Sequence, residues 1–92
     1  MEFINPTKKG YTIYSKSGCP YCDKAKKLLE DDNLTVVDCD SYLTSSKDEF
    51  LKFIANLSKK EQKMFPIIFK DAQIIGGYSD LLGYLKEDWS KN

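Results

Sequence analysis

Histidine is absent from the 92-residue sequence. Without it the chain cannot form a Ser–His–Asp triad or a Cys–His pair, and it lacks the commonest zinc ligand. Cysteine is scarce, at Cys19, Cys22 and Cys39 only. An odd number of cysteines, in a chain whose first residues show no apolar leader, does not fit the disulfide framework of a small secreted domain. We therefore expect a cytoplasmic protein whose surroundings keep thiols reduced.

The sequence also lacks an excess of charge of either sign and any long apolar run. Lys and Arg together number 14, and so do Asp and Glu. A nucleic-acid-binding domain of this size usually carries a basic excess, so no nucleic-acid partner is expected. No apolar run approaches the ~20 residues of a membrane span, so no membrane partner is expected either. The length and the 41% hydrophobic content predict a single domain over residues 1–92, with a core of about residues 10–89.

Hydrophobic periodicity and turn residues divide the chain into alternating strands and helices. Strands are predicted at 11–15, 34–38, 67–69 and 73–75, and helices at 20–32, 46–57 and 79–89. A helix joins the first two strands, which predicts a parallel pair with a right-handed crossover. A tight hairpin at 70–72 joins the last two, which are therefore antiparallel. The predicted fold is α/β, a four-stranded mixed β-sheet flanked by helices on both faces in the order β-α-β-α-β-β-α.

Each predicted helix has apolar residues three or four positions apart, which indicates the face that packs on the sheet. The residues predicted to point inward are Cys22, Ala25, Leu28 and Leu29 in the first helix, Phe50, Phe53, Ile54 and Leu57 in the second, and Leu81, Leu82, Leu85 and Trp89 in the third.

The pattern Cys19-Pro20-Tyr21-Cys22 lies where the first strand meets the first helix. Unpaired N–H groups and the positive end of the helix dipole would face the Cys19 sulfur and favour thiolate over thiol, and Lys16 adds positive charge. Pro20 suits the first helical turn, where its missing N–H costs nothing. Cys22 follows one turn later, close enough for a disulfide. Thiol–disulfide exchange needs such an asymmetric pair, with one exposed, ionised thiol and a recessed thiol that resolves the mixed disulfide.

Two other interpretations of the cysteine pair stay open. The pair could be half of a zinc site, although zinc takes four ligands and only Cys39 remains as a third. It could also be an unreactive pair at the start of a helix.

Pro66 opens the third predicted strand directly after Phe65. One interpretation is an ordinary proline at a strand start, where it is tolerated. The other is a cis peptide bond that aims the Phe65 backbone at the cysteine pair and offers a strand-like edge to a substrate peptide.

The segment Gly76-Gly77-Tyr78-Ser79-Asp80 ends the last strand and opens the last helix. Glycines allow the backbone to approach a ligand closely. The N–H groups of the helix start, together with Ser79, form an anion site suited to a carboxylate, and Asp80 could hold an ammonium group beside it. The alternative is a plain turn with a helix cap.

These three features in this order resemble the glutaredoxins of the dithiol class, from about Tyr11 to about Leu85. The resemblance implies a thioredoxin-like fold and glutathione-dependent reduction of protein disulfides and of glutathione mixed disulfides. It implies that Cys19 is the nucleophile, that Cys22 is the resolving thiol, and that the two form a redox-active disulfide. Glutathione would be a co-substrate, with no tightly bound cofactor and no metal.

The resemblance also assigns the contacts with glutathione. The residues concerned are Lys16, Tyr21, Phe65, Pro66, Gly77, Ser79 and Asp80. Lys16 would bind the glycine carboxylate, and Tyr21 would border the groove. The Phe65 backbone, before Pro66, would pair with the cysteinyl part. The remaining three residues would hold the γ-glutamyl end.

The expected partners are glutathione and proteins that are glutathionylated or contain a disulfide, with ribonucleotide reductase as one candidate, and the expected state is a monomer. Two other functions stay open. One is an iron–sulfur carrier in which Cys19 and glutathione bridge a [2Fe–2S] cluster between two subunits, against which Pro20 argues by stiffening the loop. The other is a thioredoxin-like electron donor reduced by a flavoenzyme, which would need no glutathione site at residues 76–80.

Overall fold

The computed structural model describes residues 2–59, 62 and 64–90, the side chains of 87–90 excepted. Its elements in chain order are β1 (Tyr11–Ser15), α1 (Pro20–Leu28), β2 (Leu34–Asp38), α2 (Asp40–Ser45), α3 (Lys47–Ser58), β3 (Ile67–Lys70), β4 (Gln73–Gly76) and α4 (Tyr78–Ser90). None of the helices in this described part of the chain is long and apolar enough to cross a membrane.

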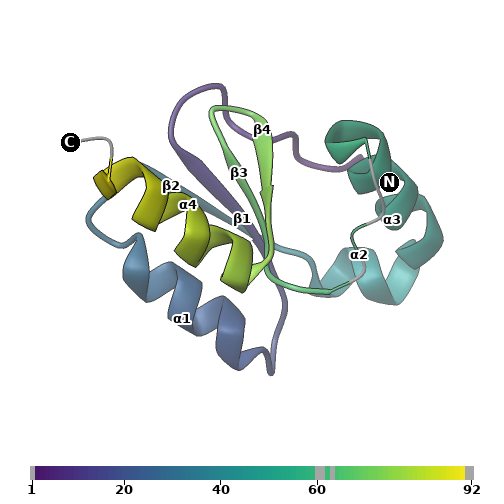
Figure 1. Ribbon diagram of the computed structural model, residues 1–92. Helices are drawn as coiled ribbons and strands as arrows, with labels where there is room; N and C mark the ends of the chain where they lie inside the picture. Colours follow the sequence, from purple (N-terminus) through teal and green to yellow (C-terminus); the bar gives the residue numbers. More distant parts are fainter. Residues whose placement is uncertain (1, 60–61, 63, 91–92) are drawn as a thin grey trace.

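The strands form one mixed sheet in the order β2-β1-β3-β4. β1 runs parallel to β2 and antiparallel to β3, and β3 runs antiparallel to β4. In Figure 1, α1 and α4 lie on one side of this sheet, and α2 and α3 lie on the other. The predicted fold class is confirmed: this is a thioredoxin-like α/β fold with a four-stranded mixed sheet.

Alternate strand residues supply a hydrophobic core on each face of the sheet, as the period of two in a strand requires. On one face, strand residues pack against Ala25, Leu29 and Leu81 from the α1 and α4 side. On the other, they pack against Tyr42, Phe50 and Ile54 of α2 and α3. The sheet is therefore covered on both sides, and the joint between β1 and α1 lies at the end of a central strand.

Two predicted inward residues in fact point to solvent. Leu28 is 45% exposed and Leu82 is 43% exposed. Each directly neighbours a fully buried leucine, and successive helical residues lie about 100° apart, so only one of the two can face the sheet. The side chain of Trp89 lies outside the described residues.

The first helix is shorter than predicted, ending at Leu28 instead of residue 32. The next residues form turns, with the Asp32 N–H donating to the Leu29 carbonyl at 2.9 Å. The acidic residues Glu30, Asp31 and Asp32 would be repelled by the negative end of the helix dipole if the helix continued, and aspartate favours turns over helix interiors. These local effects outweigh the continued helical pattern.

The short helix α2 was not predicted. Its sequence, Asp-Ser-Tyr-Leu-Thr-Ser, is too short to show a helical period and is rich in residues that favour caps and turns. It forms in its tertiary setting, where Tyr42 is buried in the aromatic cluster with Phe50 and Phe3. The other two predicted helices begin within one residue of the predicted positions.

Candidate active site

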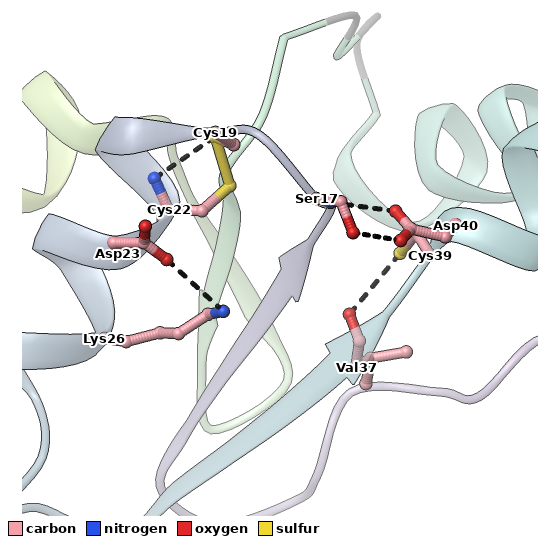
Figure 2. Close-up of a disulfide and its surroundings, with 8 residues drawn as sticks. All are labelled: Ser17, Cys19, Cys22, Asp23, Lys26, Val37, Cys39 and Asp40. Atoms are coloured by element: carbon pink, nitrogen blue, oxygen red, sulfur yellow. Dashed lines mark hydrogen bonds and ion pairs between the residues drawn. A yellow bond between two sulfur atoms is a disulfide. The ribbon is translucent and has the colours of Figure 1, made fainter.

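Cys19 occupies the N-cap of α1, as predicted, and Pro20 is the first helical residue. The Cys22 backbone N–H donates to the Cys19 Sγ at 3.2 Å. Figure 2 shows the two sulfurs joined in a disulfide, with the Cα atoms 5.2 Å apart. Cys19 is 8% exposed and Cys22 is fully buried. In this disulfide state Cys19 is thus the outer residue of the pair, which is the order that attack from outside and resolution from within require.

The three residues Lys16–Gly18 carry the chain from β1 to Cys19. Gly18 has a positive φ of 67°, the left-handed region that favours glycine. The Ser17 N–H donates to Oδ1 of Asp40 at 2.9 Å, and the Ser17 hydroxyl donates to Oδ2 of the same carboxylate (Figure 2). These two hydrogen bonds hold the pKa of Asp40 below its usual value.

The Phe65–Pro66 peptide bond is cis, which confirms the peptide geometry of the second interpretation of Pro66. Pro66 is fully buried, and the Phe65 ring stacks on Phe50 with centroids 6.3 Å apart. The Lys16 ammonium lies 5.6 Å from the centroid of the Phe65 ring. The contact places a cation from the loop before Cys19 against the residue before the cis proline.

The Gly76–Asp80 corner is a helix cap. The Gly77 N–H donates to Oδ2 of Asp80, three residues later in the chain, at 2.9 Å. Gly76 has a φ of +125°, and a Cβ there would lie 2.8 Å from the Asp80 Cγ, so only glycine fits. The capping interpretation is therefore confirmed. It does not remove the ligand interpretation, because Ser79 and Asp80 stay exposed.

A groove of about 660 Å³ runs between the cis proline and the start of α4. Six of the predicted glutathione-binding residues line it: Tyr21, Phe65, Pro66, Gly77, Ser79 and Asp80. Lys16 does not line the groove, and reaches it only through its contact with the Phe65 ring. The structure thus gathers residues from three distant parts of the sequence next to the cysteine motif.

Sequence reasoning missed several residues of this groove, among them Tyr78, Met64 and Leu82. The Tyr78 ring stacks on the Tyr21 ring with centroids 5.3 Å apart and planes 29° apart. An aromatic residue directly after the glycine pair was the available signal. Together with the 55% exposed Tyr21, these side chains give the groove an apolar rim.

Cys39 plays no part in this site. Its side chain is fully buried, and its thiol donates to the Val37 carbonyl at 3.6 Å (Figure 2). Burial raises the pKa of this thiol to about 12. Within the described residues, no three His, Cys, Asp or Glu side chains gather as metal ligands. The zinc interpretation of the cysteine pair therefore finds no third ligand here.

A disulfide within a Cys-x-x-Cys motif at a helix N-terminus, in a thioredoxin-like fold, defines a thiol–disulfide oxidoreductase. Residues 11–75 match the family model described as Glutaredoxin, and the chain belongs to the glutaredoxin family.

Among curated relatives, Glutaredoxin 1 of Escherichia coli is 34% identical over 83 residues, covering 83% of this chain and 92% of that protein. The solution structure of a dithiolic glutaredoxin from Trypanosoma brucei brucei has a TM-score of 0.67 at 34% identity, covering 85% of this chain and 78% of that one. A buckwheat glutaredoxin in complex with glutathione has a TM-score of 0.70 at 21% identity, covering 85% of this chain and 69% of that one. At this identity the similarity is one of fold alone.

Proposed function

We propose that this protein is a glutathione-dependent oxidoreductase that reduces glutathione mixed disulfides and protein disulfides through Cys19 and Cys22. The observation that carries the proposal is the groove next to the cysteine motif, because it brings Phe65 and Pro66 together with Gly77, Ser79 and Asp80 at the start of α4. Membership of the glutaredoxin family supports it. So does the buckwheat complex, as evidence that a protein of this fold can hold glutathione.

The charges along the groove suit a molecule that is zwitterionic at one end and anionic at the other. At the α4 end, the first helical N–H groups have no partner within the helix and attract a carboxylate. Asp80 beside them suits an ammonium group. Lys16 does not line the groove, but its ammonium lies over the Phe65 ring, which does, and it suits a second carboxylate. The γ-glutamyl and glycine ends of glutathione supply these groups in that order, and the Phe65 backbone would meet the cysteinyl part.

Reduction of a glutathione mixed disulfide needs only one enzyme thiol. The Cys19 thiolate attacks the glutathionyl sulfur, the old S–S bond breaks, and the substrate leaves as a thiolate that takes up a proton. A second glutathione thiolate then attacks the glutathionyl sulfur on Cys19. This step regenerates the Cys19 thiolate and releases glutathione disulfide.

Reduction of a protein disulfide uses both cysteines. Cys19 attacks one substrate sulfur, and the other substrate sulfur leaves. The Cys22 thiolate then attacks Cys19 Sγ, which releases the substrate and forms the Cys19–Cys22 disulfide. Two glutathione molecules return the enzyme to the dithiol. The buried position of Cys22 suits this internal role, because outside sulfurs cannot reach it.

The proposal assigns glutathione as co-substrate, with no tightly bound cofactor. It places the protein in a cytoplasmic setting, since the reaction needs a reduced glutathione pool. One copy of the chain supplies every residue named above. Ribonucleotide reductase is one candidate among disulfide-bearing protein substrates.

A reductant exchange tests the proposal. The protein is given a small glutathione mixed disulfide and NADPH, with either glutathione and glutathione reductase or thioredoxin reductase alone. We expect NADPH oxidation with the glutathione system only. Turnover with thioredoxin reductase alone would favour the thioredoxin-like donor. A coloured preparation that loses its visible absorbance on chelation, and has no turnover, would favour the iron–sulfur carrier.

A further inference from the structure

The pairing of β1 with β2 stops just before the loop that leads to Cys19. The last paired residues are Ser15 and Asp38. One further backbone hydrogen bond follows, from the Cys39 N–H to the Ser15 carbonyl at 2.8 Å. The chain then enters α2 at Asp40, so no backbone carbonyl of a continuing strand is offered to the Ser17 N–H.

The Asp40 side chain supplies the acceptor that a continuing strand would otherwise offer to the Ser17 N–H. Its Oδ1 accepts from the Ser17 N–H at 2.9 Å, and its Oδ2 accepts from the Ser17 hydroxyl (Figure 2). A carboxylate is a strong acceptor, and charge-assisted hydrogen bonds are roughly twice as strong as neutral ones. The same hydrogen bonds lower the pKa of Asp40, because they stabilise its ionised form.

Asp40 is itself held firmly. Its own N–H donates to Oδ1 of Asp38 at 2.9 Å, and its carbonyl accepts from the Thr44 hydroxyl at 2.9 Å. The helix that it begins is fixed to the core by the buried Tyr42. The acceptor that binds Ser17 is thus attached to the sheet and to the core on the α2 and α3 side.

Only Gly18 lies between the anchored Ser17 and Cys19, and a glycine by itself restrains the chain poorly. We propose that Asp40 is a positioning residue for the dithiol chemistry. Its two hydrogen bonds to Ser17 fix the loop so that the Cys19 Sγ stays at the N-terminus of α1, where the Cys22 N–H donates to it. The inference concerns the dithiol itself and holds whichever reductant the enzyme uses.

Positioning and simple electrostatics predict opposite effects on the Cys19 thiol. An anion disfavours a nearby thiolate, so by charge alone the removal of Asp40 would lower the pKa of Cys19. If Asp40 acts by positioning, its removal lets the Cys19 sulfur leave the helix N-terminus and raises that pKa. The other charged groups around the loop stay the same in every variant below: Lys16, Asp23, Lys26 and Asp38.

The test measures the iodoacetamide reaction of Cys19 against pH in the reduced protein, with the modified cysteine identified by mass mapping. Ser17→Ala and Asp40→Ala should each raise the pKa of Cys19 by about 0.5 unit, on the scale of a helix-terminus interaction. At a pH below that pKa, alkylation then slows about threefold. Asp40→Asn should stay near wild type, because an amide can accept from the Ser17 N–H and donate to its hydroxyl.

Asp31→Ala is the control for lost charge, because this exposed residue follows the far end of α1. Ser17→Ala keeps both the charge of Asp40 and the backbone hydrogen bond, so it reports positioning even if Asp40→Ala does not fold. A lower pKa of Cys19 in both Asp40 variants, with no change in Ser17→Ala, would overturn the proposal in favour of electrostatics. An unchanged pKa of Cys19 in both Ser17→Ala and Asp40→Ala, with a lower melting temperature, would show that the contact serves the stability of the fold alone and would overturn the proposal. Failure of glutathione turnover would leave these alkylation results untouched.

Discussion

The Gly77 N–H donates to Oδ2 of Asp80 at 2.9 Å, so one carboxylate both caps α4 and lines the groove beside the dithiol. The two roles can be separated by substitution. Asparagine keeps an oxygen that can accept from the Gly77 N–H but carries no charge to hold an ammonium group. Alanine loses both.

We expect Asp80→Asn to raise the KM for glutathione with little change in melting temperature. The lost contact with an ammonium group corresponds to about 1–3 kcal/mol, or about 5- to 150-fold. Asp80→Ala should raise the KM similarly and also lower the melting temperature, because the cap is lost. Coupled turnover assays and thermal denaturation of both variants check this. A wild-type KM in Asp80→Asn would leave Asp80 with the capping role alone.

Lys16 should contribute binding energy for glutathione through its charge. Its ammonium lies 5.6 Å from the centroid of the Phe65 ring, which lines the groove, and its side chain is exposed to solvent. An exposed ion pair is worth up to about 1 kcal/mol, so Lys16→Gln should raise the KM for glutathione roughly two- to fivefold. The wild-type KM should rise with salt, and the variant should lose much of that dependence.

The matched control for this prediction is Lys52→Gln, which removes the same charge from the exposed face of α3. Equal effects of the two substitutions would show that Lys16 acts through net charge and not through a contact with the ligand.

Cys39 should be inert in the folded protein. Its pKa is raised from 9.0 to about 12, and its side chain is fully buried. Alkylation of the reduced native protein at neutral pH should therefore modify Cys19 and leave Cys39 intact until denaturant is added. Mass mapping decides the point, and modification of Cys39 at the rate of an exposed thiol would contradict the packing described above.

The same raised pKa predicts how stability depends on pH. The folded state holds the Cys39 proton more tightly than the unfolded state does. This contribution to stability is fully present below about pH 9 and is lost as the pH rises towards 12. Denaturant unfolding at pH 8 and at pH 10.5 should show a larger loss in the wild type than in Cys39→Ala. Part of the loss should remain in the variant, because burial also raises the pKa of Tyr14.

Local signals in the sequence predicted the parts of the site that depend on neighbours along the chain. The position of Cys19 at a helix start follows from Pro20 and the strand before it, and the glycine corner follows from Gly76 and Gly77. The cis bond before Pro66 was one of two interpretations, and the structure decided between them.

The features that escaped prediction depend on distant contacts. Asp40 accepts hydrogen bonds from Ser17, which lies 23 positions away in the sequence. No sequence pattern next to either residue predicts this contact. The helix α2 forms because Tyr42 is buried among rings from α3 and the N-terminal segment. Periodicity likewise does not tell which leucine of the pair Leu81 and Leu82 is buried, because both lie close to the apolar stripe.

The two cysteines should separate the two reactions. Cys22→Ser should keep reduction of glutathione mixed disulfides, which needs only the Cys19 thiolate, and should lose most protein-disulfide reduction. It should reduce the small substrate at or above the wild-type rate, since Cys22 can no longer divert the intermediate into the internal disulfide. Cys19→Ser should abolish both activities, because only Cys19 has its sulfur at the helix N-terminus.

The most direct test is NADPH oxidation by Cys22→Ser acting on a glutathionylated substrate, with glutathione and glutathione reductase present. Sustained turnover at or above the wild-type rate is predicted, with Cys19→Ser as the inactive control. A Cys22→Ser variant that is folded but inactive towards this substrate would contradict the monothiol step at Cys19, and with it the glutathione-dependent mechanism.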